Sequence, residues 1–143
     1  MSQENVEIVR RGWDAFFRDM NERNLDDVFA AVFDAGMFAP DATLSPSLDA
    51  AGSRTFVGRQ GFIEWTRTWA EAFVDYRLQL EDVVDAGDEH VVLVVRQSAT
   101  GRESGASVEL RFGIVFTFKG GQVTEQRHYT DPAEAFKAVG LAE

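Results

Sequence analysis

Residues 108–130, VELRFGIVFTFKGGQVTEQRHYT, alternate apolar and polar side chains before a short break at Lys119-Gly120-Gly121 and carry mostly polar side chains after it. Alternation with a period of two is typical of β-strands, and a glycine pair between two such runs is typical of a hairpin turn. The stretch therefore predicts two antiparallel strands, at 108–118 and 122–130.

The length of the turn decides which side chains of the second strand share a face with the phenylalanines of the first. A two-residue turn at the glycine pair would place Glu125 and Arg127 beside them. A three-residue turn, with Gly121 in the left-handed conformation of a bulge, would instead place Gln126 and His128 there. Burial of an acid and an arginine against phenylalanines is unfavourable, and a one-residue slip exchanges the two faces. The sequence therefore favours the three-residue turn.

The rest of the chain divides into helices followed by strands. Apolar residues recur every three or four positions in the first half, which predicts helices, and every two positions later. The expected elements are helices at 3–20 and 24–36, a short strand at 42–44, an extended piece at 55–57, a helix at 59–74, strands at 76–84 and 90–98, the hairpin at 108–130, and a short helix that Asp131 and Pro132 open. This order is typical of an α+β fold. We expect a single domain over residues 1–143, in which three N-terminal helices cover the concave side of a cone-shaped, curved antiparallel sheet, with a short C-terminal helix.

Composition and charge exclude several classes of function. The chain of 143 residues has no cysteine, two histidines and a net charge of −10. Disulfides and cysteine-ligated zinc are therefore excluded, and we expect no metal and no cofactor. A strongly acidic protein repels nucleic acid and anionic membranes, and no apolar run approaches the ~20 residues of a membrane span. The polar start of the chain lacks the apolar region of a signal peptide, so we expect a cytoplasmic protein.

The register of the two strands before the hairpin makes a further prediction. A three-residue turn ending at Gly87 would place Val92, Val94 and Arg96 on the helix-covered face, where Arg96 would be the one charge. The opposite face would then carry the apolar side chains of Val91, Leu93, Val95 and Val115. Because a wide apolar sheet face is rarely left exposed, we expect a homodimer packed through this outer face.

Short stretches along nearly the whole chain carry a family resemblance. They are ENVEIVRR at 4–11, APDAT at 39–43, FVGR at 56–59, DAGD at 85–88 and YTDPAEAF at 129–136. On these stretches the chain resembles the SnoaL-like family. That family lies within a superfamily of cone-shaped α+β barrels that includes nuclear transport factor two, ketosteroid isomerases, scytalone dehydratases and limonene epoxide hydrolases. The resemblance implies this fold and a dimer packed through the sheet, and it leaves the reaction open because the superfamily hosts many chemistries.

The chain departs from the relatives whose chemistry the resemblance would suggest. It places Ser45, Trp13 and Ile114 where ketosteroid isomerases carry their carboxylate base, oxyanion-binding tyrosine and oxyanion-binding acid, so steroid isomerisation is excluded. Of the Asp-Arg-Asp arrangement of the epoxide hydrolases, Arg96 alone has a match. Asp131 is the nearest candidate for the acidic base of SnoaL-type cyclases, and its position before a helix explains it better as a cap.

The candidate site combines three polar side chains with an aromatic wall. His128 would transfer a proton or donate a hydrogen bond to a ligand, since its ordinary pKa lies near 6.5; the alternative is a hydrogen-bonded core histidine. Arg96 would clamp a carboxylate or enolate oxygen, or else pack its stem inward and extend its guanidinium to solvent. Gln126 would bind a ligand between them or satisfy its neighbours. The expected wall residues are Trp13, Trp65, Trp69, Phe112 and Phe116.

Two classes of function follow from this site. One is a cofactor-free acid–base catalyst (an isomerase, cyclase, dehydratase or hydrolase) that acts on a small, largely apolar, oxygenated molecule. The other is a non-catalytic ligand carrier or dimerisation module. The sequence places no carboxylate in the predicted pocket, which favours the second class somewhat. We also expect burial to lower the pKa of His128.

Overall fold

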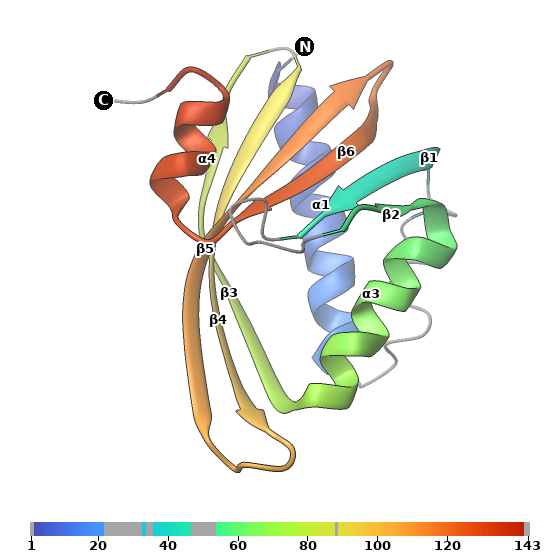
Figure 1. Cartoon of the computed structure of the whole chain (residues 1–143). Coiled ribbons are helices and arrows are strands. Elements are labelled where there is room, and N and C mark those ends of the chain that lie inside the picture. The colour runs from blue at the N-terminus through green and yellow to red at the C-terminus, as the bar shows by residue number, and fades with distance from the viewer. Residues whose placement is uncertain (1, 22–32, 34–35, 47–53, 88, 142–143) are drawn as a thin grey trace.

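The computed structural model describes residues 2–21, 33, 36–46, 54–87 and 89–141 (Figure 1). Its elements are α1 (Ser2–Asn21), β1 (Phe38–Ser45), β2 (Phe56–Val57), α3 (Gly58–Ala72), β3 (Phe73–Asp85), β4 (His90–Gly101), β5 (Ser107–Lys119), β6 (Gln122–Tyr129) and α4 (Pro132–Ala138). The predicted α+β class is confirmed. The helix predicted at 24–36 lies almost entirely outside the described residues.

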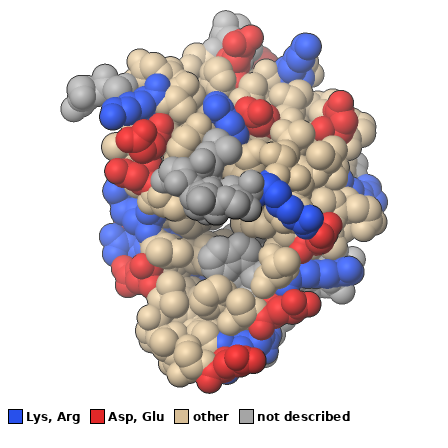
Figure 2. Space-filling view, viewed as in Figure 1, with Lys and Arg blue, Asp and Glu red and all other residues tan. Residues whose placement is uncertain are grey.

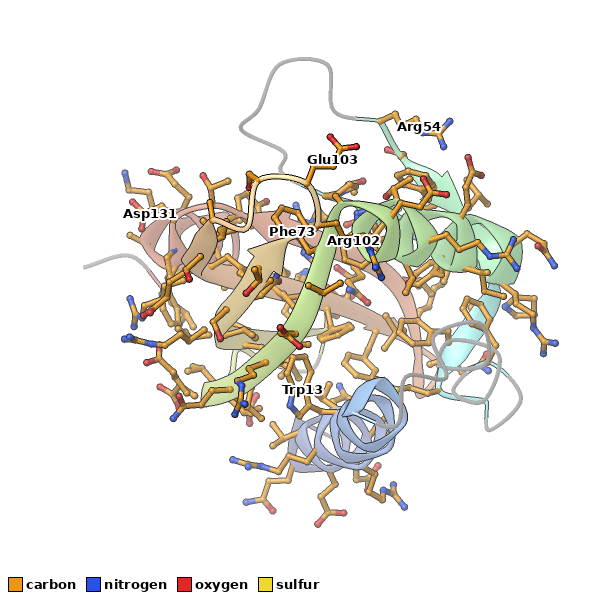
Figure 3. All side chains as sticks on the ribbon, turned by 90° about the horizontal axis from the view of Figure 1, so that it is seen from below. Trp13, Arg54, Phe73, Arg102, Glu103 and Asp131 are labelled. Carbon is orange, nitrogen blue, oxygen red and sulfur yellow. The ribbon has the colours of Figure 1, made fainter. Side chains whose placement is uncertain are left out.

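Six strands form one strongly curled sheet in the order β2-β1-β6-β5-β4-β3. Helices α1 and α3 lie on its concave side and α4 on its convex side, as Figures 1 and 3 show from two directions. The β1–β6 pair is parallel and all other pairs are antiparallel, so the sheet is mixed rather than wholly antiparallel.

The hairpin between β5 and β6 has the predicted side chains on its inward face, but its extra residue lies in the strand and not in the turn. Its turn is the two-residue Gly120-Gly121, with positive φ angles of 61° and 80° as a type I′ turn requires. The extra residue lies farther along the strand, where Thr124 is left out of the pairing and the next residue pairs with Thr117. Because of this bulge, the same side chains of β6 face inward as a three-residue turn would have placed there. The predicted turn is wrong, and the predicted inward position of Gln126 and His128 is confirmed.

A second bulge overturns the predicted faces of β4. The pairing of β3 with β4 shifts between Leu80 and Asp82, so Glu81 is an extra residue. Without the extra residue, Leu80 would pair with Arg96 and the two side chains would point to the same face. With it, Leu80 pairs with Val95, so these two side chains point inward and Arg96 points outward. The concave side of β4 therefore carries Val91, Leu93, Val95 and Gln97.

The apolar outer face on which the predicted homodimer depended is consequently absent. Val91, Leu93 and Val95 have no exposed surface and pack in the core beneath the helices. Val115 does face outward, but it is buried against Ala135 of α4. A homodimer through the outer sheet face remains a prediction, although the four valine and leucine residues on which it was argued form no exposed apolar patch there.

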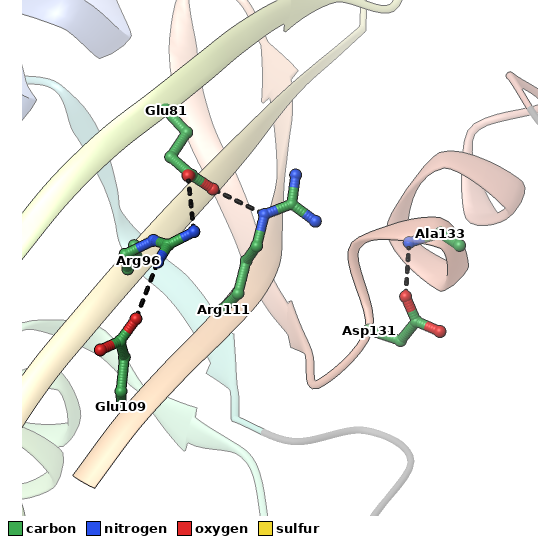
Figure 4. Close-up of polar contacts among 6 residues, drawn as sticks. All are labelled: Glu81, Arg96, Glu109, Arg111, Asp131 and Ala133. Carbon is green, nitrogen blue, oxygen red and sulfur yellow. Dashed lines mark hydrogen bonds and ion pairs between the residues drawn. The ribbon is translucent and has the colours of Figure 1, made fainter.

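The last helix begins where the sequence predicts. The Asp131 carboxylate accepts a hydrogen bond from the Ala133 backbone N–H at 2.9 Å, with Pro132 at the first helical position (Figure 4). The backbone of Gly113 lets this helix lie close to the sheet, because a Cβ at that position would come within 2.7 Å of the Ala135 Cβ. Asp131 is thus a helix cap, as the sequence favours.

Charges of both signs are intermixed over the face shown in Figure 2 rather than gathered by sign. Of the helices in the described part of the chain, none combines the length and apolar character needed to cross a bilayer.

Candidate functional site

A cavity lies between α1, α3 and the concave face of the sheet. About 70 Å³ within it can hold the centre of a water molecule, and the whole empty space, with the open solvent at its mouth, is about 590 Å³. From the helices it is lined by Val9, Gly12, Trp13 and Trp65, from β1 and the residue before it by Phe38 and Met37, and from the sheet by Leu78, Gln97, Phe112, Ile114, Phe116, Gln126 and His128. Trp13 projects from the side of α1 that faces the sheet (Figure 3). The cavity is therefore almost wholly apolar, with a few polar groups in fixed places, as is usual for small-molecule sites.

Most of the predicted site residues meet at this cavity. The structure places His128, Gln126, Trp13, Trp65, Phe112 and Phe116 in its lining. Trp69 belongs to α3, and its side chain lies outside the described part of the structure. The positions of the six residues agree with the sequence prediction, and their roles remain predictions.

His128 and Gln126 form a buried polar pair. They lie two residues apart on one face of β6, and each side chain is more than nine-tenths buried. The Gln126 Nε2 lies 2.8 Å from the His128 Nε2. An amide nitrogen only donates, so the imidazole Nε2 accepts and its proton resides on Nδ1. Rotation of the amide by half a turn would present its oxygen instead and favour the other tautomer.

Aromatic rings surround the imidazole. The ring of Trp65 approaches it edge-on at 5.2 Å, and the ring of Phe112 stacks on it at 5.6 Å with an interplanar angle of 13°. Burial among these rings disfavours the charged form and lowers the pKa of His128 to about 4. The direction is the one that the sequence predicts, and it makes His128 a neutral group at pH 7.

Arg96 does not reach the cavity, so its predicted position is wrong. Its guanidinium lies on the exposed outer face, 2.7 Å from the Glu109 carboxylate and 3.4 Å from that of Glu81 (Figure 4). Arg111, directly across from Arg96 on β5, bonds the other oxygen of Glu81 at 2.6 Å. Arg111 first, and Arg96 after it, hold the pKa of Glu81 below its ordinary value. The bulge at Glu81 thus both turns Arg96 outward and supplies the carboxylate that separates two like charges.

Gln97 is the polar lining residue that the sequence analysis missed. It occupies the inward position next to Arg96 and is 8% exposed. The run Val91–Val95 is apolar on both faces, so its alternation alone cannot show which face is inward. Pairing with β5 could, since Leu93 and Val95 lie opposite the inward-facing Ile114 and Phe112.

Carboxylates are missing from the cavity wall as far as the structure describes it. Within the same described residues no group of three or more histidine or acidic side chains is placed to hold a metal ion. The chemistry available at the wall is that of two amides, two indole N–H groups and one neutral imidazole.

A known family model matches most of the chain. Residues 13–126 match the family model of the SnoaL-like domain. A search of curated proteins found no match to this chain.

Solved structures similar to this chain share its fold. An NTF2-like protein of unknown function from Burkholderia pseudomallei K96243 has a TM-score of 0.68 and 21% identity, with 96% of this chain and 98% of that chain covered. A protein from Catenulispora acidiphila DSM 44928 with a ketosteroid isomerase-like fold, in complex with trimethylamine, has a TM-score of 0.66 and 14% identity, over 91% and 92% of the two chains. The epoxide hydrolase/cyclase-like enzyme SalBIII, with a role in pyran ring formation in the polyether salinomycin, has a TM-score of 0.64 and 22% identity, over 90% and 93%. Since the family model also spans well over half of the sequence, the chain belongs to the family of SnoaL-like domains.

Proposed function

We propose that this protein binds a small, largely apolar molecule that carries an oxygen function, in the cavity between α1, α3 and the sheet. The observation that carries the proposal is the buried Gln126–His128 pair at the wall of an otherwise apolar cavity. A buried polar pair costs desolvation, and at the surface of a cavity it offers hydrogen bonds that a bound molecule can use.

The geometry supports a neutral hydrogen bond from His128 to the ligand. Its Nε2 is occupied by Gln126, and no described residue bonds Nδ1. With a pKa of about 4 the ring is uncharged at pH 7, so Nδ1–H donates as a neutral group. Such a donor suits a carbonyl, ether or hydroxyl oxygen, and it does not provide the full positive charge that a carboxylate would need.

Acid–base catalysis is the second candidate, and the Gln126–His128 pair is the observation that favours it. If the amide rotates, its oxygen accepts from Nε2–H and Nδ1 becomes a base. A ring that accepts a proton at Nδ1 from one atom of a bound molecule and returns it from Nδ1 to another can move a proton without a cofactor. Similarity to an epoxide hydrolase/cyclase-like enzyme is consistent with such a role. The low pKa and the absence of a carboxylate in the described wall favour binding alone.

Substitution of His128 by leucine is expected to weaken binding of an oxygenated probe about tenfold, because one buried hydrogen bond contributes roughly 1–1.5 kcal/mol. The measurement is a titration of tryptophan fluorescence, which Trp13 and Trp65 report at the cavity wall. 2-Naphthol is the oxygenated probe and naphthalene its apolar counterpart. The leucine variant should bind naphthalene as the unmodified protein does.

His90, the other histidine, supplies the matched control, because it is not among the residues that line the cavity. His90→Leu should leave both affinities unchanged. If His128→Leu changes neither affinity, or if neither probe binds the unmodified protein, the proposed function is wrong. Native mass spectrometry of the purified protein would identify any small molecule that the cavity retains.

Exchange of α-protons distinguishes the two candidates. With 1-tetralone in D₂O, a catalyst should accelerate deuterium incorporation beside the carbonyl, and His128→Leu should abolish the acceleration. A carrier would bind the ketone without accelerating exchange. Nuclear magnetic resonance measures the incorporation directly.

A further inference from the structure

Gln97 is a buried amide at the wall of the cavity. Its residue is 8% exposed, and within the described part of the chain its side chain makes no hydrogen bond. Gln97 is among the residues that line the cavity. Withdrawing an amide from bulk water without a partner costs about 1–3 kcal/mol. A ligand group in the cavity would recover that cost.

The position of Gln97 is remote from the Gln126–His128 pair. Gln97 lies opposite Leu110 on β5, and His128 lies opposite Ile114 on the same strand. Four residues of strand separate those two positions, which is about 13 Å along the strand at ~3.3 Å per residue. Gln97 and His128 also belong to the two strands on either side of β5, so their backbone positions are well separated on the cavity wall, and Phe116 and Gln126 line the cavity two residues beyond those of His128 and its partner.

The wall between Gln97 and His128 is apolar. Phe112 lies midway between Leu110 and Ile114 on β5 and faces the cavity, with Trp13 among the lining residues contributed by α1. A molecule that reaches both residues must therefore have an apolar body.

From this arrangement we infer that the cavity selects a two-ended ligand, with one neutral oxygen group held by Gln97 and another held by His128. The inference rests on the proposed function and deepens it by naming the class of ligand. A glutamine amide donates and accepts, so a hydroxyl group, which does both, satisfies it best. A carboxylate or an ammonium group would be desolvated without a counter-charge, since the described wall carries none. The ligand class is a rigid apolar skeleton, such as a linked or fused aromatic system, with hydroxyl or carbonyl groups at both ends.

A series of biphenyl probes tests the inference. Fluorescence or calorimetric titration would compare biphenyl, 4-hydroxybiphenyl and 4,4′-dihydroxybiphenyl. The unmodified protein should bind the dihydroxy probe about tenfold more tightly than the monohydroxy probe, as one further buried hydrogen bond would produce. Gln97→Leu should remove that preference and leave the affinity for 4-hydroxybiphenyl within twofold, whereas His128→Leu should weaken both hydroxylated probes.

Two further variants make the outcome decisive. Gln79, exposed on the strand that pairs with β4, supplies the control, and Gln79→Leu should change no affinity. Gln97→Met keeps the length of the side chain without its polar atoms, and it replaces the leucine variant if that one does not fold. Equal binding of the two hydroxylated probes by the unmodified protein, or equal weakening of both in the Gln97 variants, would overturn the inference while the proposed function stands. Failure of all three biphenyls to bind would instead count against the proposed function.

Discussion

Replacing Phe62 by alanine is expected to lower the free energy of unfolding by about 3–5 kcal/mol. Phe62 projects from α3 into the core and has no exposed surface. Its ring packs against those of Phe33 and Phe38 at centroid distances of 5.2 and 5.1 Å. Alanine would lose these contacts and leave a void that the neighbouring rings can fill only in part. Urea denaturation monitored by circular dichroism measures the loss.

The matched control is Val57→Ala, at the position immediately before α3. Val57 is 59% exposed, so truncation there should change the stability by no more than about 0.5 kcal/mol. If Phe62→Ala costs no more than the control, the packing of α3 on the concave face is wrong. The site would be affected too, because Trp65 belongs to the same helix.

Acidification should destabilise the protein through His128 by about 3 kcal/mol between pH 6.5 and pH 4. Above pH 6.5 the imidazole is neutral in the folded and the unfolded chain. Below it the unfolded chain takes up a proton at the ordinary pKa of 6.5, whereas burial holds the folded pKa at about 4. The unfolded state then binds more protons, so stability falls as the pH falls, and each pKa unit of difference is worth ~1.4 kcal/mol.

Comparison with His128→Leu isolates this contribution. The acidic side chains of the protein also titrate in this range, but the unmodified chain and the variant share them. The difference in unfolding free energy between the two should therefore change by about 3 kcal/mol in favour of the variant from pH 7 to pH 4. A difference that stays constant with pH would show that His128 is not buried as a neutral group.

The inward face of β6 was predictable because the cost of burying charged side chains constrains it more strongly than the length of the turn does. Glu125 and Arg127 cannot be buried against phenylalanines, so whichever residue is extra, Gln126 and His128 must face inward. The sequence could not distinguish an extra residue in the turn from one at Thr124, since both give the same parity. Burial preferences thus establish which face is inward, and the backbone detail needs the structure.

Arg96 shows where the same reasoning fails. The prediction extended the alternation of β3 without interruption, but its inward apolar residues are Leu78, Leu80 and Val83, and the last step is three residues rather than two. The sequence does not show this change of phase, because valine occupies both position 83 and position 84. The neighbouring strand, β4, is apolar on both faces from Val91 to Val95, so its sequence alone does not show which face is inward. Gln97 was missed for the same reason, because the face assigned to Arg96 excluded it.

The parallel pairing of β1 with β6 is a long-range feature that local pattern does not encode. The two strands are separated in the chain by α3 and four strands, and β1 joins the sheet beside the strand that carries His128. Turn residues specify hairpins between neighbouring strands, but no turn links these two. By contrast, the cap at Asp131 is local and was predictable from three consecutive residues.

Titration of the His128 imidazole by nuclear magnetic resonance tests the central claim most directly, namely that a neutral histidine lies at the wall of an apolar cavity. A His90→Gln variant leaves a single imidazole in the chain, so its signals need no assignment. We expect a midpoint near pH 4 and, above it, nitrogen shifts of the tautomer protonated at Nδ1. A midpoint near the ordinary 6.5, with the averaged shifts of an exposed ring, would contradict the inward position of His128 and the site built on it.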